Sequence, residues 1–387
     1  MRERLLIVGA SARAAAESAA RANFLPMAVD QFGDQDLRRI ADLRTCERFP
    51  EEIPGLAAEL PPAGFVLTGA MENHRSILEV LTASRPLLGC SLEAIAAVRD
   101  PIRVQAILKK CNLPTVATSS SEPIHTSGDL WLKKPVRGSN GAGICPLTES
   151  ATPTPTESFY YQKLIPGISQ SGLFLASAQS TVLIGVTEQW IGASWLNANP
   201  FGYAGSFGPL QLDEKTQRNW ERIGSALGQH CGLQGIFGVD AVAQNGTIYV
   251  IEVNPRYTAS AEILDIAGDG QLMRDHVRAC RDGKAKTSIR LPSEKAHAKA
   301  IYYTPRDIVV PCGLEKLFFD KSNESGIPRL ADIPIPGTQI KKKHPVCTLL
   351  ATGSNRKQIR SQLKRAVHSL QKHLICNTNQ EVDSQAN

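Results

Sequence analysis

The sequence lacks several features that would place it in a specialised class of protein. No apolar run approaches the ~20 residues that a helix needs to span a bilayer, so we expect no membrane segment. No C-x-x-C pair occurs among its nine scattered cysteines, which argues against a zinc ribbon and a disulfide framework. The excess of 43 Lys and Arg over 37 Asp and Glu is too small to indicate a nucleic-acid partner.

The start of the chain imitates a secretion signal. A basic residue precedes the apolar run at residues 5–10, and Ala-Ser-Ala follows, but the run is too short for the hydrophobic region of a signal peptide. We therefore expect residues 5–9 to form a buried strand and the protein to be cytoplasmic. The length of 387 residues suggests two or three domains.

The first 95 residues alternate short apolar runs with segments of helical composition, which is typical of a parallel α/β sheet. Two helices are expected over residues 91–113, where Asp100 caps the second helix and Pro101 is its first residue. In the N-terminal part we expect further strands at residues 26–30, 65–68 and 86–89 and a helix at residues 73–84.

Strand signals dominate between residues 130 and 253. Asn245-Gly246 lies between two apolar runs and is the strongest short-range signal for a two-residue hairpin turn. A third region follows, with a strand at residues 300–303, a Pro-rich loop at residues 332–337 and an amphipathic helix near residues 356–374. We interpret the basic residues of that helix as a solvated face, with a polyanionic substrate as the alternative.

The first candidate site is the turn after the first strand. Gly9, with Asp30 at the end of the next strand, imitates a dinucleotide-binding fingerprint. However, Ser11 stands where a second Gly would let the backbone approach a pyrophosphate, and Ala14 stands at the third position. We interpret the segment as an ordinary strand-to-helix turn, and a dehydrogenase is an alternative that rests on Gly9 and Asp30 alone.

The second candidate is a Gly-rich loop that follows a strand ending at Lys134. Gly138, Gly141 and Gly143 can adopt positive φ and let backbone N–H groups converge on phosphate oxygens. Lys134 adds a positive charge for the phosphates. No Gly-Lys-Ser/Thr closes the loop, so it is not a Walker A loop, and a merely flexible hairpin loop is the alternative.

The third candidate is a set of hard oxygen ligands on the hairpin around Asn245-Gly246. Regular pairing places Asp240 opposite Ile251, so a small adjustment is needed to bring Asp240 and Glu252 to one face. Together with Asn254 they suit Mg²⁺ that keeps nucleotide phosphates as its other ligands. The alternative is a row of solvated polar positions. We expect the apolar neighbours to point into the core: Val239, Ile251 and Val253.

These pieces, in this order and spacing, resemble the ATP-grasp superfamily of ATP-dependent carboxylate–amine ligases over nearly the whole chain. The resemblance implies an α/β fold, in which a Rossmann-like domain precedes an ATP-grasp fold and a C-terminal closing segment. It implies four parts: residues 1–95 as the preceding domain, 96–175 with the opening helices and the lid, 176–290 with the metal and substrate sites, and 291–387 as the closing segment.

The resemblance also implies roles for individual residues. Asp240, Glu252 and Asn254 would hold Mg²⁺, or Mn²⁺ in its place, and Arg256 would steady the transferred phosphoryl group or the acyl phosphate. Lys134 would act in catalysis as well as in binding. ATP would be held by the lid loop and the adenine linker, through Lys134, Gly138, Ser139, Asn140, Gly141, Gly143, Gln162, Lys163, Leu164 and Ile165.

The chain departs from the superfamily pattern at positions that bear on nucleotide affinity. Pro101 follows Asp100 where many members carry a phosphate-binding Lys, and Arg103 or Lys109 could compensate. Lys163 stands in the adenine linker where an acid is usual, and the acid that often binds the ribose is missing near Ser169.

The C-terminal region resembles ATP-grasp proteins of one-carbon cofactor pathways, of the methanopterin or methanofuran type, at residues 298–303, 331–337 and 345–348. The resemblance implies a ligase that activates a carboxylate as an acyl phosphate and joins it to an amine. A non-catalytic ATP-binding sensor or scaffold is the alternative. We expect small-molecule partners, with a homo-oligomer left open, and a substrate pocket at residues 203–209 and 257–262.

Overall fold

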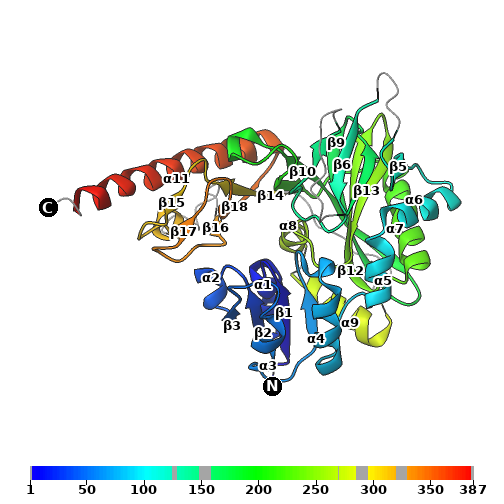
Figure 1. Cartoon of the computed structure of the whole chain (residues 1–387), viewed down its shortest axis with the longest axis horizontal. Helices are drawn as coiled ribbons and strands as arrows, with labels where there is room; N and C mark the ends of the chain where they lie inside the picture. The colour runs from blue at the N-terminus through cyan, green and yellow to red at the C-terminus, as the bar shows by residue number, and fades with distance from the viewer. Residues whose placement is uncertain are drawn as a thin grey trace.

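The N-terminal part is a parallel sheet with the strand order β3-β2-β1-β4 (Figure 1). The structure, a computed structural model, describes residues 2–123, 129–147, 158–268, 270–284, 295–319 and 329–384. The elements of this part are β1 Arg4–Gly9, α1 Arg13–Arg21, β2 Leu25–Asp30, α2 Gln35–Arg38, β3 Asp42–Thr45, α3 Ile53–Ala58, β4 Phe65–Leu67, the short helix η1 Met71–Asn73 and α4 Arg75–Ser84. The parallel α/β arrangement predicted from the sequence is confirmed.

Two details of this sheet differ from the prediction. The prediction of a strand at residues 86–89 is wrong, since Leu87 forms only an isolated bridge with Phe65. Pro86 has no N–H to donate, so pairing stops after the two hydrogen bonds that flank Leu87. The edge strand β3 was not expected, because its residues are polar and only partly buried.

Two capped helices lead into the next part of the chain. In α5 (Leu92–Val98) the Ser91 side chain accepts a hydrogen bond from the Ala94 N–H. In α6 (Pro101–Lys110) the Asp100 carboxylate accepts hydrogen bonds from the N–H groups of Ile102 and Arg103. The second helix therefore begins where its capping Asp predicted, and the first is capped by a Ser whose role was not predicted.

A small four-stranded sheet, ordered β5-β8-β6-β7, carries the Gly-rich loop. Its strands are β5 Thr118–Ser119, β6 Trp131–Pro135, β7 Cys145–Pro146 and β8 Phe159–Lys163. The antiparallel strands β6 and β7 are joined by residues 136–144, so the loop is the turn of a hairpin.

An eight-stranded antiparallel sheet, ordered β13-β12-β9-β10-β11-β14-β18-β16, runs through the rest of the molecule. Its strands are β9 Ile168–Ala176, β10 Thr181–Ile191, β11 Tyr203–Gly208, β12 Gly235–Gln244, β13 Thr247–Asn254, β14 Ala296–Tyr303, β16 Arg329–Ala331 and β18 Pro345–Gly353. The other elements are η2 Ser194–Leu196, α7 Glu214–Cys231, α8 Ala261–Ala267, α9 Leu272–Asp282, β15 Ile308–Val309, α10 Lys316–Phe319, β17 Gln339–Ile340 and α11 Arg356–Ser384. One sheet thus connects the proposed metal hairpin to the closing segment.

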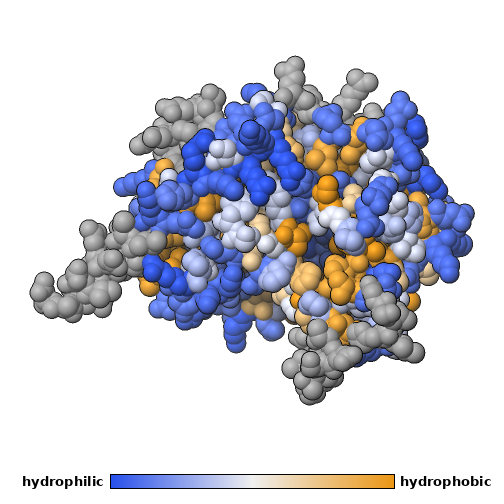
Figure 2. Space-filling view, turned by 90° about the horizontal axis from the view of Figure 1, so that it is seen from above, coloured by the Kyte–Doolittle hydropathy of each residue, from blue (hydrophilic) through white to orange (hydrophobic). Residues whose placement is uncertain are grey.

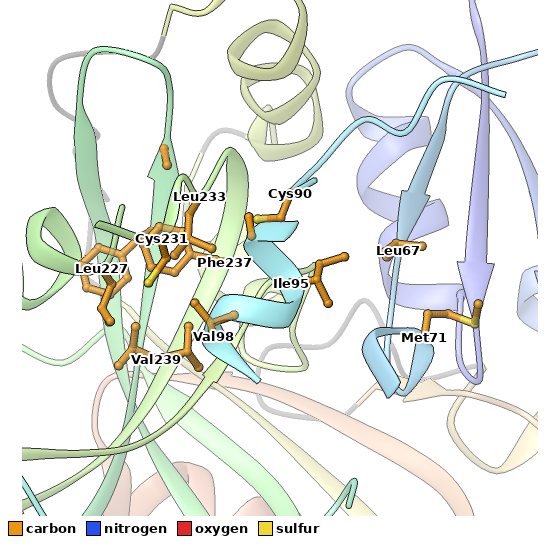
Figure 3. Close-up of a cluster of buried hydrophobic side chains, with 14 of the residues drawn as sticks. Leu67, Met71, Cys90, Ile95, Val98, Leu227, Cys231, Leu233, Phe237 and Val239 are labelled. Carbon is orange, nitrogen blue, oxygen red and sulfur yellow. The ribbon is translucent and has the colours of Figure 1, made fainter. Parts of the chain in front are cut away.

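The core beneath this sheet joins it to the N-terminal part. Phe174 of β9 stacks on Phe237 of β12 at a centroid distance of 5.1 Å and packs against Trp220 of α7. Figure 3 shows Ile95 of α5 between Met71 of η1 and the residues of the sheet. This cluster fixes the opening helices against the strands that carry the site.

The long helix α11 covers the closing segment and extends away from the body of the molecule (Figure 1). Its predicted apolar face is confirmed, since Ile359, Leu363, Val367, Leu370 and Leu374 are all buried. The basic residues of the other face are exposed. Within the described residues, no helix is long and apolar enough to cross a membrane.

We predict that Leu363→Ala lowers the free energy of unfolding by about 2–5 kcal/mol, because it opens a cavity beneath α11. The neighbouring side chain Lys364 is exposed, so Lys364→Ala should change that energy by less than about 0.5 kcal/mol. Urea denaturation followed by far-ultraviolet circular dichroism measures both. Equal losses in the two variants would contradict the packing of α11.

Candidate functional site

The hairpin of β12 and β13 brings two carboxylates face to face. Asn245 and Gly246 both have positive φ, 49° and 76°, as a tight two-residue turn requires. Pairing is regular up to Ala241 and Val250, and then shifts by one residue, so that Asp240 lies opposite Glu252. This bulge supplies the adjustment that the sequence left open.

The bulge also changes the position of Ile251. The sequence predicted that its side chain would be in the core beside Val239 and Val253. Those two residues are buried, with 0% and 1% exposure, but Ile251 is only partly buried and lines the cleft. The prediction for Ile251 is wrong because the extra residue of a bulge does not keep the alternation of the strand.

Asp240, Glu252 and Asn254 lie together at the base of the cleft. The Asn254 Nδ2 donates to Asp240 Oδ2 at 3.0 Å, and Gln189 Nε2 donates to Asp240 Oδ1 at 3.0 Å. Burial raises the pKa of Asp240 to about 6, and the charge of Glu252 adds to the rise. Two crowded carboxylates beside an amide oxygen form a hard donor set that suits Mg²⁺. No cluster of three or more His, Cys, Asp or Glu side chains suited to a metal occurs in the described part of the chain.

Arg256 connects this hairpin to the N-terminal part. Its Nε donates to Glu72 Oε1 at 2.8 Å, and its NH2 group donates to Asn254 Oδ1 at 3.2 Å. The Tyr257 N–H also donates to the Leu67 carbonyl at 3.2 Å. The end of β13 is therefore anchored to β4 and η1, which fixes the Arg256 guanidinium beside the carboxylates.

Lys134 and Gln162 lie on neighbouring strands of the small sheet. The Lys134 Nζ donates to Gln162 Oε1 at 3.1 Å. Both residues are buried, with 6% and 5% exposure. Both line the same cleft as Asp240 and Glu252. The structure thus brings the strand-end Lys of the Gly-rich loop to the acidic hairpin.

The Gly-rich loop lies across the cleft and contacts its far wall. Asn140 Nδ2 donates to the Tyr303 hydroxyl at 3.2 Å, and Asn140 Oδ1 accepts from the Tyr203 N–H at 3.2 Å. Gly141 has a φ of +71°, and a Cβ there would lie 2.0 Å from the Phe201 carbonyl oxygen, so only Gly fits. The predicted loop residues Gly138, Ser139, Asn140 and Gly141 line the cleft, whereas Gly143 is not among its lining residues.

The expected adenine linker also lines the cleft, through Gln162, Lys163, Leu164 and Ile165. The Lys163 Nζ forms an ion pair with Asp129 at 2.7 Å. The Lys163 and Leu164 N–H groups donate to the carbonyls of Ala117 and Leu130. These bonds hold the linker against the neighbouring strands.

The cleft has a volume of about 1000 Å³ and is bordered by all parts of the fold. Residues of the N-terminal sheet, the Gly-rich loop, the linker, the hairpin of β12 and β13 and the closing segment line it. Of the two segments expected to form the substrate pocket, Tyr203 and residues 257–260 line it. Figure 2 shows hydrophobic residues gathered on one half of the upper face of the molecule and mainly hydrophilic residues on the other.

Arg99 belongs to the site and was not expected. Its NH1 group donates to Glu252 Oε1 at 2.6 Å, while its NH2 group donates to Asn73 Oδ1 and to the Val136 and Gly138 carbonyls. Arg103 and Lys109, the two cations suggested as substitutes for the missing Lys, do not line the cleft. The only signal in the sequence was the position of Arg99 next to the capping Asp100.

Asp30, by contrast, serves the turn in which it lies. Its carboxylate accepts hydrogen bonds from the N–H groups of Ala12, Phe32 and Gly33, at 2.7 to 2.8 Å. Burial raises the pKa of Asp30 to about 6, although these bonds oppose the rise. This arrangement supports the interpretation as a strand-to-helix turn, since three amides already surround the carboxylate that a ribose would need.

We predict that Arg99→Ala makes residues 136–144 more sensitive to proteinase K. The lid loses the donor to two of its carbonyls, and about 1 kcal/mol of lost hydrogen bonding corresponds to roughly fivefold faster cleavage. Mass spectrometry of the fragments measures the rate. Arg103→Ala is the control, because Arg103 is exposed on α6 and its N–H donates to the capping Asp100 and not to the lid. Unchanged cleavage of Arg99→Ala would contradict a role in holding the lid.

Comparisons with known proteins agree on the architecture. A family model of the ATP-grasp domain matches residues 99–260. No match to a curated protein was found. Biotin carboxylase from Campylobacter jejuni, in its β-γ-ATP complex, is similar with a TM-score of 0.69 and 12% identity over 94% of this chain and 90% of that chain.

Two ligases of other kinds are similar to the same extent. L-amino acid ligase from Bacillus licheniformis has a TM-score of 0.68 and 16% identity, over 95% of this chain and 97% of that chain. N5-carboxyaminoimidazole ribonucleotide synthetase from Thermus thermophilus has a TM-score of 0.68 and 14% identity, over 93% and 97%. The predicted fold class is confirmed: the chain has an ATP-grasp fold behind a parallel α/β domain.

Proposed function

We propose that the protein is an ATP- and Mg²⁺-dependent ligase that joins a carboxylate to an amine through an acyl phosphate. The proposal rests on one observation: Asp240 lies directly opposite Glu252, with Asn254 beside them, in a cleft that Lys134 also lines. Mg²⁺, or Mn²⁺ in its place, would supply charge neutralisation for the ATP phosphates. The residues that would hold it are these three oxygen donors.

The other residues of the cleft bind and orient in this proposal. Lys134 and the N–H groups of residues 138–143 hold the phosphates and exclude water, and Gln162 to Ile165 receive the adenine. Arg256, held by Glu72, stabilises the charge of the acyl phosphate. Positioning and electrostatics supply most of the rate enhancement of phosphoryl transfer, so no nucleophilic side chain is needed.

The comparisons support an enzyme of this kind, because the similar proteins include an L-amino acid ligase and a ribonucleotide synthetase. The residue roles and the division into residues 1–95, 96–175, 176–290 and 291–387 remain predictions. Arg99 adds one role: it pairs with Glu252 and donates to two carbonyls of the lid loop, so it would link the lid to the residues that would hold the cation.

We predict that Glu252→Gln reduces ADP formation by at least about 100-fold, since it removes a metal carboxylate that balances transition-state charge. Its fold should remain, because Gln still accepts a hydrogen bond from Arg99. The matched control is Glu221→Gln on the exposed face of α7, which should keep full activity. A coupled ADP assay and circular dichroism measure the two properties. Full turnover by Glu252→Gln would overturn the assignment.

The second candidate function is an ATP-binding sensor or scaffold, which Pro101 and Lys163 favour because both depart from the usual nucleotide contacts. We predict that ADP release requires a carboxylate and an amine together. A panel of acid–amine pairs, each omitted in turn, measures this requirement. Tight ATP binding without ADP release across the panel would favour the sensor instead.

We further propose that the ligase acts in the biosynthesis of a one-carbon carrier cofactor. The support is the resemblance of residues 298–303, 331–337 and 345–348, two of which form β14 and the start of β18 beside the cleft. Disruption of the gene should remove an amide-linked form of the carrier from cell extracts analysed by mass spectrometry. An unchanged set of carriers would reject the pathway without rejecting the ligase.

A further inference from the structure

A second charged cluster borders the cleft where the closing segment meets the N-terminal part. The Pro-rich loop docks on α2: the Gln35 N–H donates to the Ile333 carbonyl at 2.8 Å, and Asp36 accepts from the N–H groups of Asp332 and Ile333 at 2.9 Å. Two segments about 300 residues apart in the sequence thus form one wall. None of these contacts was used in the proposed phosphoryl transfer.

The cations of this cluster are already paired. Arg13 is fully buried and contacts Glu262 with both NH groups and Asp332 with Nε at 2.8 Å and NH2 at 3.1 Å. Lys299 donates to Glu262 Oε2 at 2.8 Å. Burial alone would raise the pKa of Glu262, but Arg13 and Lys299 lower it below its usual value. These cations are therefore not disposed to take up an anionic ligand.

Asp34 is the unpaired member of the cluster. Its residue is 5% exposed and lines the cleft, its side chain does not cap α2, and no hydrogen bond from another described residue reaches its carboxylate. Burial, with the charges of Asp332, Asp30 and Asp36, raises the pKa of Asp34 to about 9, and only Arg13 opposes the rise. A carboxyl group buried among like charges ionises readily only when a cation binds beside it.

Apolar side chains stand beside this carboxylate in the same cleft. Phe32 is two residues before Asp34 and is 48% exposed. Pro334 and Ile335 follow Asp332 in the docked loop, and Ile335 is 36% exposed. All three line the cleft. The wall therefore offers a carboxyl group that can pair with a cation, next to apolar surface.

We propose that Asp34 and Asp332 bind a primary ammonium group, carried on an apolar stem, of one substrate of the ligation. This inference rests on the proposed function and adds the chemical class of a substrate. An ammonium has three N–H donors, so it can satisfy the free oxygens of Asp34 and the part of Asp332 that faces the cleft. It also supplies a positive charge to Asp34. Arg13 and Lys299 do not supply that charge, because they already form ion pairs with Glu262 and Asp332.

The test compares hexylamine with hexanol and hexanoate, which have the same stem and a different head group. Isothermal titration calorimetry is run with the full chain in the presence of ADP and Mg²⁺, after ADP binding has been measured alone. We expect hexylamine to bind at least about tenfold more tightly than the other two, from its charge-assisted hydrogen bonds. Asp34→Asn should remove this preference and leave ADP binding unchanged.

Asp42→Asn is the matched control, since Asp42 is an exposed residue of the same sheet that pairs with Arg44 outside the cleft. It should keep the preference for hexylamine. Asp34→Ser removes the carboxylate with a smaller side chain and serves as the second variant if Asp34→Asn does not fold. Equal binding of the three probes, or a preference that survives in the Asp34 variants, would overturn the ammonium site. If the wild-type protein prefers hexylamine but does not bind ADP, the ligase is rejected and the ammonium site is not.

Discussion

The one-residue shift between β12 and β13 is the constraint on which the proposed site depends. Without the bulge, Asp240 would lie opposite Ile251, and the two carboxylates would point to different faces of the hairpin. Like charges directly opposite each other destabilise a sheet. Here Asn254 and Gln189 donate to Asp240, and Arg99 pairs with Glu252, so each carboxylate has a partner within the protein.

A second constraint holds the walls of the cleft at a fixed distance. Arg13 is buried between Glu262 of α8 and Asp332 of the closing segment, and N–H groups of the Pro-rich loop donate to Asp36 of α2. Breaking a buried ion pair by removing one partner costs about 3–5 kcal/mol, so the closing segment cannot leave the N-terminal part easily. The lid is attached more weakly, through a few hydrogen bonds from Arg99 and Asn140, and is therefore the part of the cleft that opens at least cost.

The sequence predicted those parts of the fold that depend on local chemistry. Asn245-Gly246 identified the hairpin turn, Asp100 with Pro101 identified the start of α6, and the spacing of apolar residues identified α11. Contacts between distant segments could not be predicted in the same way. Arg99 meets Glu252 only because α5 packs against the sheet, and Asp36 meets the N–H of Asp332 only because a loop 300 residues later docks on α2. The misplaced Ile251 shows that a single bulge, which leaves no mark in the apolar pattern, decides which face a residue occupies.

The buried carboxylates of the cleft couple stability to ligands. The pKa of Asp240 is raised from 3.8 to about 6, and that of Asp34 is raised further, so the folded state binds protons more tightly than the unfolded state. Stability is therefore lost as the pH rises through the raised values, where these groups must ionise while buried. A cation that binds beside either carboxylate opposes this loss, because it stabilises the ionised form in the folded state alone. The two acidic positions thus destabilise the folded protein as the pH rises for the same physical reason that a bound cation would stabilise it.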